Sequence, residues 1–257
     1  MTRRTNGFTI IEVLVTISLI AVLLVILLPN LTTGRRETGF AQCISNMRAF
    51  AIAQNLYATD NDYNFVPTNW GPATGGWLYY KERTPGARNF VAPGSVPYLQ
   101  RIEMRETGLL FDYLDTDGQL YHCPVDEGPF DDAEIRREEG TSVSFPVRAM
   151  TSYTFNGAFR GYGGPTPPGG TFAIDLFKPN DIFLWEADAL STRAQNGYWN
   201  DGANRPDEGL AERHLDGAPV SRVDGSADKM VFEDFYEIVR DRTRNELWCS
   251  PDSANGR

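Results

Sequence analysis

The stretch that decides the fold is "GFTIIEVLVTISLIAVLLVILLP", residues 7–29. Its only charged residue is Glu12. At about 1.5 Å per residue, a helix over 8–28 covers roughly the 30 Å hydrocarbon core of a bilayer. We therefore expect a membrane-spanning helix at 8–28.

The residues that flank this run indicate its orientation. Arg3 and Arg4 precede it, which favours a cytoplasmic N-terminus and places the rest of the chain outside the cytoplasm. Arg35 and Arg36 on the far side weaken this prediction. A cleaved secretory signal is the weaker alternative, because its apolar core would be shorter and would end in small residues.

Glu12 is the unusual residue of the run. A carboxylate in a transmembrane helix costs about 2.5–3.5 kcal/mol on insertion scales. One interpretation leaves Glu12 near the lipid headgroups, partly hydrated and passive. The other gives the charge a role that offsets this cost.

Gly7, Phe8, Thr9 and Glu12, followed by an unbroken apolar helix, resemble the class III signal of type IV pilins and type II secretion pseudopilins. The resemblance implies that a prepilin peptidase cleaves after Gly7 and that Phe8 becomes N-methylated. It also implies a docking role for Glu12, whose carboxylate would neutralise the N-terminal amine of a neighbouring subunit. Such an attraction is stronger in a low-dielectric filament core than in water.

The function implied is a structural subunit of a type II secretion pseudopilus or a type IV pilus-like filament in bacteria. Its partners would be prepilin peptidase, copies of itself and other pilin-like subunits, an inner-membrane assembly platform and membrane lipid. The protein would cross the inner membrane once, with its head in the periplasm. The alternative is a membrane-anchored module that binds glycans or exported proteins through Trp70 and Trp77 without polymerising, although such an anchor has no use for Glu12.

The helix is expected to continue beyond the apolar run. Pro29 should weaken it, because proline lacks an amide donor and clashes with the preceding turn. After that point apolar residues recur at steps of three or four, interrupted by Gln54: Phe40, Cys43, Met47, Phe50 and Tyr57. The polar cluster at 59–62 should end the helix. The predicted division is a leader at 1–7, a helix at 8–59 with 8–28 in the membrane, and a globular head at 60–257.

The head has the pattern of an antiparallel sheet with short helices. Segments 152–159 and 181–188 read as strands, Asp224-Gly225 as a type I′ hairpin turn, and 106–114 and 233–248 as helices. The predicted fold class is therefore α+β, a long N-terminal helix packed on a C-terminal antiparallel sheet, which is the pilin-like plan.

The head carries a second resemblance. "HCPVD", "SYTFNG" and "RH" followed by "VDG" are similar to the heads of a group of bacterial prepilin-type proteins. Many of those have Asp-Gly-His at the hairpin, whereas this chain has Asp224-Gly225-Ser226, so no metal role is carried over for that histidine.

Charge and motifs argue against two function classes. A formal net charge of -10 makes nucleic acid a poor partner. The two histidines, His122 and His214, lie in no recognisable catalytic string, and Cys123 followed by proline reads as structural. We therefore expect no enzymatic activity.

Three cysteines allow one disulfide and one spare thiol. Cys123 with Cys249 is slightly favoured, since both lie in loops with proline and aspartate, while Cys43 lies on the inward stripe; the other pairings stay open. Asp115, Asp117 and Gly118 match part of a calcium loop, and major pseudopilins often hold calcium in the head. A plain Asp-Gly turn is the competing interpretation, and we expect no cofactor.

Overall fold

The computed structural model of the chain describes residues 9–70, 75–80, 103–114, 118–126, 150–162, 170–187 and 202–257, apart from the side chains of 26–33, 35 and 36. The chain forms two compact units, Met1–Gly39 and Phe40–Arg257, and each is described by itself. The predicted division placed its last boundary at residue 59. Contacts group the helix from Phe40 onward with the head, and the predicted division into leader, helix and head stays a prediction.

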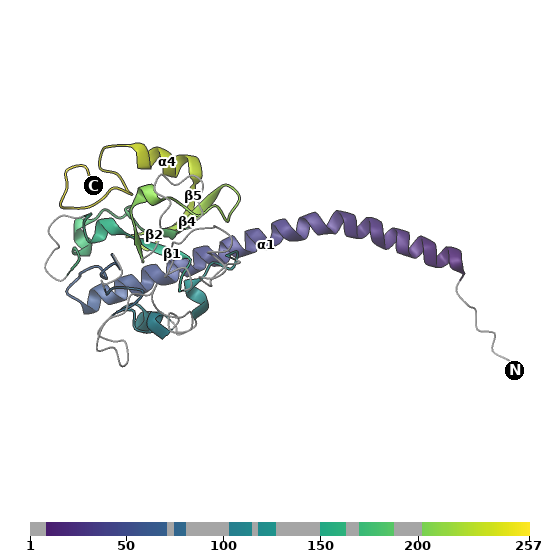
Figure 1. Ribbon diagram of the computed structural model, residues 1–257, viewed down its shortest axis with the longest axis horizontal. Helices are drawn as coiled ribbons and strands as arrows, with labels where there is room; N and C mark the ends of the chain where they lie inside the picture. Colours follow the sequence, from purple (N-terminus) through teal and green to yellow (C-terminus); the bar gives the residue numbers. More distant parts are fainter. Residues whose placement is uncertain are drawn as a thin grey trace, which may run out of the picture. The chain divides into compact units, whose positions relative to one another are not determined.

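The long helix is present as α1, Ile10–Asp60 (Figure 1). It ends at the predicted polar cluster, where Asp62 and Tyr63 adopt positive φ angles of 55° and 58°. The Tyr63 N–H donates to the carbonyl oxygen of Ala58 at 2.8 Å, which closes the last turn. α1 runs as helix through Pro29, and the weakening expected there stays a prediction.

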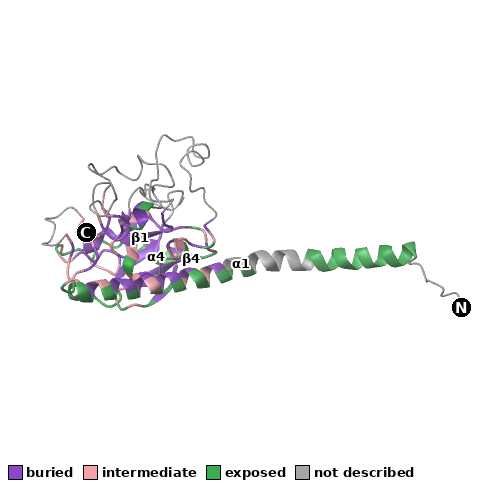
Figure 2. Cartoon of the chain, turned by 90° about the horizontal axis from the view of Figure 1, so that it is seen from below, coloured by how far each residue is buried: buried purple, intermediate pink, exposed green. Residues whose placement is uncertain are grey.

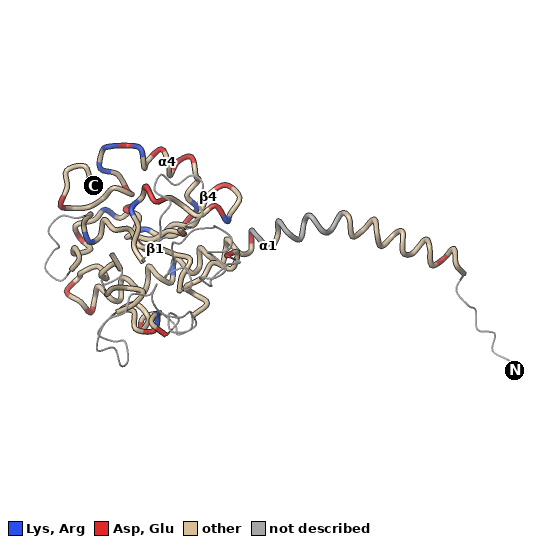
Figure 3. Tube along the Cα trace, viewed as in Figure 1, with Lys and Arg blue, Asp and Glu red and all other residues tan. Residues whose placement is uncertain are grey.

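Ile10 to Val25 is the apolar part of α1 whose side chains the structure describes. Figure 2 shows these residues as exposed within their unit, and Figure 3 shows them as almost entirely uncharged. Over the described part of the chain, no helix combines the length and apolarity that crossing a membrane requires. The membrane span at 8–28 therefore stays a prediction.

From Phe40 onward, one face of α1 packs into the head (Figure 2). Cys43, Met47 and Phe50 on the predicted stripe have no exposed surface. Gln54, which interrupts the stripe, is also buried, and its Oε1 accepts a hydrogen bond from the Val66 N–H at 3.1 Å. The stripe is confirmed as the inward face of α1. Its polar position, Gln54, binds the backbone of the segment that follows the helix.

The head contains a five-stranded sheet with the order β3-β1-β2-β4-β5. Its strands are β1 (Tyr153–Asn156), β2 (Ile182–Glu186), β3 (Ala203–Asn204), β4 (Gly217–Arg222) and β5 (Ala227–Val231). The neighbours β1/β2, β2/β4 and β4/β5 are antiparallel, as predicted. β3 pairs parallel with β1, so the prediction of a wholly antiparallel sheet is wrong. A two-residue strand carries too little pattern to be recognised in the sequence.

The β4–β5 hairpin lies where Asp224-Gly225 predicted it. Its turn is not the two-residue type I′ form. The Gly225 N–H donates to the Arg222 carbonyl at 3.0 Å, and the Arg222 N–H donates to the Ser226 carbonyl. Gly225 has φ +88°, the left-handed conformation that a glycine adopts readily. The loop is therefore longer than expected, and the glycine supplies the reversal.

The C-terminal helix is shorter than the predicted range 233–248. α4 covers Phe232–Arg240 and contacts β5. Beyond it, the Asn245 side chain donates to the Ile238 carbonyl at 3.0 Å and accepts from the N–H groups of Leu247 and Trp248. These side-chain bonds replace helical ones. The helix predicted at 106–114 contains a 3₁₀ turn, Phe111–Tyr113; further 3₁₀ turns are Gly118–Tyr121, Gly157–Phe159, Ile174–Leu176 and Pro206–Glu208.

An aromatic cluster joins α1 to the sheet. The Phe50 ring meets the rings of Trp77, Tyr121 and Tyr153 edge-on, with centroids 5.6, 5.3 and 5.8 Å away. Trp77 is fully buried, and its Nε1–H donates to the Gly202 carbonyl at 2.7 Å. It cannot take part in the glycan-binding surface of the alternative function.

Candidate functional sites

Thr9 and Glu12 are linked by reciprocal hydrogen bonds at the start of α1. The N–H and the hydroxyl of Thr9 donate to Glu12 Oε2 at 2.7 and 2.8 Å, and the Glu12 N–H donates to Thr9 Oγ1 at 3.3 Å. This is a capping box, which satisfies N–H groups that have no partner inside the helix. Glu12 thus has a local role that the sequence analysis missed, although Thr-x-x-Glu before an apolar run is its known signal.

The same geometry leaves part of Glu12 available. Both Thr9 donors contact Oε2, and Oε1 accepts no hydrogen bond from the described residues. Around this carboxylate the apolar side chains are exposed within their unit, from 80% at Ile10 to 47% at Val13. Contiguous apolar surface of this kind marks a contact with lipid or with a partner. Gly7 and Phe8, the predicted cleavage and methylation residues, lie outside the described residues.

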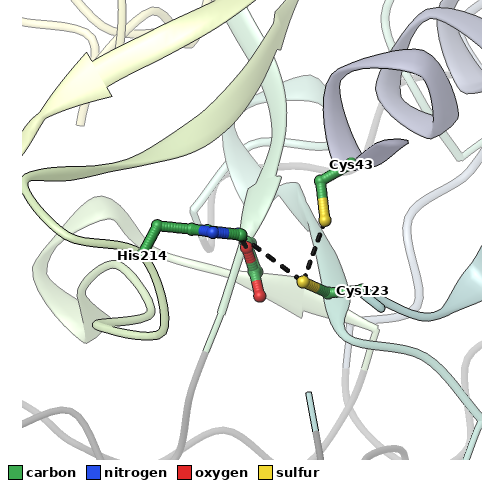
Figure 4. Close-up of side chains that lie close together, drawn as sticks. Cys43, Cys123 and His214 are labelled. Atoms are coloured by element: carbon green, nitrogen blue, oxygen red, sulfur yellow. Dashed lines mark hydrogen bonds and ion pairs between the residues drawn. The ribbon is translucent and has the colours of Figure 1, made fainter. Parts of the chain in front are cut away.

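A second site lies inside the head, where Cys43, Cys123, Glu186 and His214 converge. Figure 4 shows Cys43, Cys123 and His214 at this site. Cys43 Sγ and Cys123 Sγ are 2.8 Å apart, and Cys123 Sγ is 3.5 Å from His214 Nε2. His214 Nε2 is 3.0 Å from Glu186 Oε2. One ligand atom from each of the four residues lies within 4.8 Å of the others, and all four residues are buried.

Each cluster residue comes from a different segment of the head. Cys43 lies on the inward face of α1, and Glu186 ends β2 opposite Tyr153 of β1. Cys123 follows a 3₁₀ turn and is fixed by its N–H, which donates to Ser152 Oγ at 3.0 Å. His214 lies in the segment that leads into β4, with its ring edge-on to Phe40 at 4.9 Å.

Arg213 and Asp126 form a charged shell around the cluster. Arg213 Nη1 donates to Glu186 Oε1 and to the Ala187 carbonyl, both at 2.9 Å. Arg213 Nη2 lies 3.1 Å from Asp126 Oδ2, which also accepts from Ser152 Oγ at 2.8 Å. Arg213 thus fixes Oε1 of Glu186, and the other oxygen, Oε2, faces His214.

The cluster shifts the pKa values of its members. Burial alone would lower the pKa of His214, but hydrogen bonds to Cys123 and Glu186 outweigh it and raise that pKa to about 9. Burial would raise the pKa of Glu186, and the hydrogen bond from His214 with the charge of Arg213 lowers it instead. The hydrogen bond to Cys43 and burial raise the pKa of the Cys123 thiol.

Cys123 and His214 do not have the character of a nucleophile and its base. A reactive cysteine is partly exposed and has a lowered pKa. Cys123 is 1% exposed, and its pKa is raised. His122, its neighbour in sequence, has its pKa lowered by burial to about 4. The histidine that meets Cys123 is His214, 91 residues further along the chain.

The favoured disulfide between Cys123 and Cys249 is absent, and all three cysteines are free. Cys249 lies elsewhere in the core, where its sulfur is 3.9 Å from Asn156 Nδ2. Cys123 is instead adjacent to Cys43, which the sequence analysis had treated as the spare thiol. Proline and aspartate near a cysteine describe its loop and carry no information about its partner in space.

One sequence prediction lies outside the described residues, and part of the cluster was not predicted. Asp115 and Asp117 of the calcium loop are not among the described residues, so calcium there stays a prediction. Glu186 and the role of His214 were missed. Long sequence separations hide the cluster, and its only visible trace was that the chain has so few cysteines and histidines to bring together.

Comparison with known families gives one match. Residues 2–28 match the family described as the prokaryotic N-terminal methylation motif. This is the signature of type IV pilins and pseudopilins. Comparisons with curated proteins and with solved structures find no match.

Proposed function

We propose that this chain is a prepilin-like subunit that is cleaved after Gly7, methylated at Phe8 and polymerised through α1. The observation that carries the proposal is the methylation motif at residues 2–28, which contains Gly7, Phe8 and Glu12 in the required order. Cleavage requires a prepilin peptidase, and polymerisation requires copies of this chain or other pilin-like subunits. The filament is a type II secretion pseudopilus or a type IV pilus, and its subunits carry no enzymatic activity.

The helix supports this proposal through its surface. Before assembly, residues 8–28 lie in the inner membrane, with the N-terminus in the cytoplasm and the head in the periplasm. This placement rests on the apolar run and on the matched motif. In the filament, the exposed apolar side chains between Ile10 and Val25 pack against the helices of neighbouring subunits.

Glu12 has two tasks in this proposal. Its Oε2 caps its own helix through Thr9, and its Oε1 receives the methylated amine of the next subunit. Because the capping bonds hold the side chain in place, less conformational freedom is lost when the amine docks. The glycan-binding alternative is not adopted, because Trp77 is buried in the core.

The first test is the mass of the membrane-extracted protein and of its N-terminal peptide. The expected N-terminus is methylated Phe8. An intact chain that starts before Gly7 would contradict the proposal at its first step.

Three variants then separate the two tasks of Glu12. Glutamine at a capping-box position keeps the hydrogen bond without the charge. If docking depends on charge, Glu12→Gln and Glu12→Ala both lose sheared or crosslinked filaments, while Thr9→Ala, which removes only the capping hydroxyl, keeps them. If Glu12→Gln assembles like wild type while Glu12→Ala does not, capping is the only role of Glu12.

A further inference from the structure

We infer that Cys43, Cys123, His214 and Glu186 form a structural zinc site in the head, a site that does not depend on the proposed function. Two sulfurs, an imidazole nitrogen and a carboxylate oxygen converge from four segments of the chain (Figure 4). Zinc is bound in proteins by these ligand types, with four of them in a closed structural site.

The spacing fits tetrahedral coordination. Zinc bonds of about 2.0–2.3 Å place tetrahedral ligand atoms about 3.3–3.8 Å apart. Cys123 Sγ and His214 Nε2, 3.5 Å apart, lie in this range, whereas His214 Nε2 and Glu186 Oε2, 3.0 Å apart, must separate by about 0.3 Å. The two sulfurs, at 2.8 Å, must separate by about 1 Å to hold an ion between them. Rotation of the two cysteine side chains can supply a change of this size.

The ligand types select the class of metal. Thiolates favour zinc and other borderline or soft ions, whereas calcium and magnesium require oxygen ligands. A divalent ion bound by two thiolates and one carboxylate leaves one negative charge, which the Arg213 guanidinium, shared between Glu186 at 2.9 Å and Asp126 at 3.1 Å, offsets in part. On binding, the thiol protons and the proton on His214 Nε2 pass to solvent.

The surrounding contacts hold the ligands in the orientation that a metal needs. Arg213 occupies Oε1 of Glu186 and leaves Oε2 directed at His214 Nε2. The Val125 N–H lies 3.4 Å from Cys123 Sγ, a bond that stabilises a thiolate. Such outer contacts fix the rotamers of metal ligands.

The burial of the four ligands indicates a structural zinc and not a catalytic one. The exposed fractions of Cys43, Cys123, Glu186 and His214 are 0, 1, 0 and 6%. A catalytic zinc keeps a position open for water or substrate, whereas here four protein ligands would fill the tetrahedral positions. The ion would join α1 to the loop at Cys123, to β2 and to the segment before β4.

The test uses the full chain, extracted in detergent. One portion is kept reduced for metal analysis, and a second portion is extracted without reductant for thiol labelling. Elemental analysis should find about one zinc per chain. Replacement of zinc by cobalt should give the sulfur-to-metal charge-transfer absorption and the intense visible bands of tetrahedral cobalt thiolates. Cys43→Ser, Cys123→Ser and His214→Gln should each weaken zinc binding by at least about 10–100-fold, the loss typical of altering even an outer contact.

Cys249→Ala is the matched control, because Cys249 is equally buried and lies outside the cluster. It should bind zinc like the wild type. If a ligand variant fails to fold, the wild-type protein still tests the inference. Thiol alkylation after denaturation should label all three of its cysteines. A Cys43–Cys123 disulfide, a reduced protein without bound metal, or a cobalt spectrum without sulfur charge transfer would each overturn the inference.

Discussion

Phe50 and Ile52 lie two positions apart on α1 and have opposite environments. Phe50 is fully buried among three aromatic rings, whereas Ile52 is 61% exposed. Phe50→Ala should lower the free energy of unfolding of the head by about 3–5 kcal/mol, because it removes buried surface and leaves a cavity. Ile52→Ala should change it by less than about 0.5 kcal/mol. Urea unfolding followed by tryptophan fluorescence measures both, and equal losses would contradict this assignment of the inward face.

Asn156, at the end of β1, holds together segments that are distant in sequence. Its Nδ2 donates to the carbonyls of Ile182 and Leu247 at 2.8 and 2.9 Å, and its Oδ1 accepts from the Ala158 N–H at 2.9 Å. Asn156→Ala leaves these buried groups without partners, and each costs about 1–3 kcal/mol. We expect a loss of about 3 kcal/mol or more in thermal or urea unfolding.

Asn255→Ala is the control for Asn156, because its side chain is exposed and bonds only to nearby residues. It should cost less than about 1 kcal/mol. A similar loss in both variants would mean that the Asn156 bonds are not what holds the three segments.

Gly256 and Gly170 share a left-handed backbone, with φ +75° and +85°. A Cβ at Gly256 would overlap the carbonyl of Trp248, whereas a Cβ at Gly170 meets no atom of the described residues within 4 Å. Gly170→Ala should cost only the strain of this conformation, about 1–2 kcal/mol. Gly256→Ala should cost more, because the C-terminal loop must also shift. Melting temperatures compare the two variants, and equal values would show that the loop adapts without cost.

Asp181 and Asp241 should respond to acid in opposite ways. Burial raises the pKa of Asp181, so its contribution to stability grows as pH falls through that raised pKa. The N–H and hydroxyl of Thr243 lower the pKa of Asp241, so its contribution is lost as pH falls below the usual carboxyl value. Urea unfolding from neutral to acidic pH, with Asp181→Asn and Asp241→Asn beside the wild type, should show these opposite trends. Parallel trends would contradict them.

The parts of the fold that depend on regular residue spacing, or on a residue type that a turn favours, could be predicted from the sequence. The inward stripe through Cys43, Met47 and Phe50 follows helical spacing, and Gly225 identifies the hairpin because its conformation favours glycine. β3 could not be predicted, since two residues show no period. α4 was predicted too long, because the backbone is already extended at Asp241, with φ −63° and ψ 128°, and helical spacing alone does not reveal that.

The two candidate sites also differ in whether the sequence could predict them. Thr9 and Glu12 are three residues apart, so their capping box could be read directly from the sequence. Cys43, Cys123, Glu186 and His214 meet only after the sheet has formed and α1 has packed on it. Sequence spacing carries no information about such a meeting, so the sequence could not show that Cys43 is the cysteine that lies next to Cys123.

In the proposed filament, the position of Cys43 on α1 would have a mechanical consequence. Tension along such a filament would reach the head through α1, and packed apolar side chains slide past one another more easily than coordinated sulfur leaves a metal. With zinc bound, Cys43 would link α1, through the metal, to the three head segments that supply the other ligands. Chelation should therefore lower the force at which the head peels from its helix in a single-molecule pulling experiment.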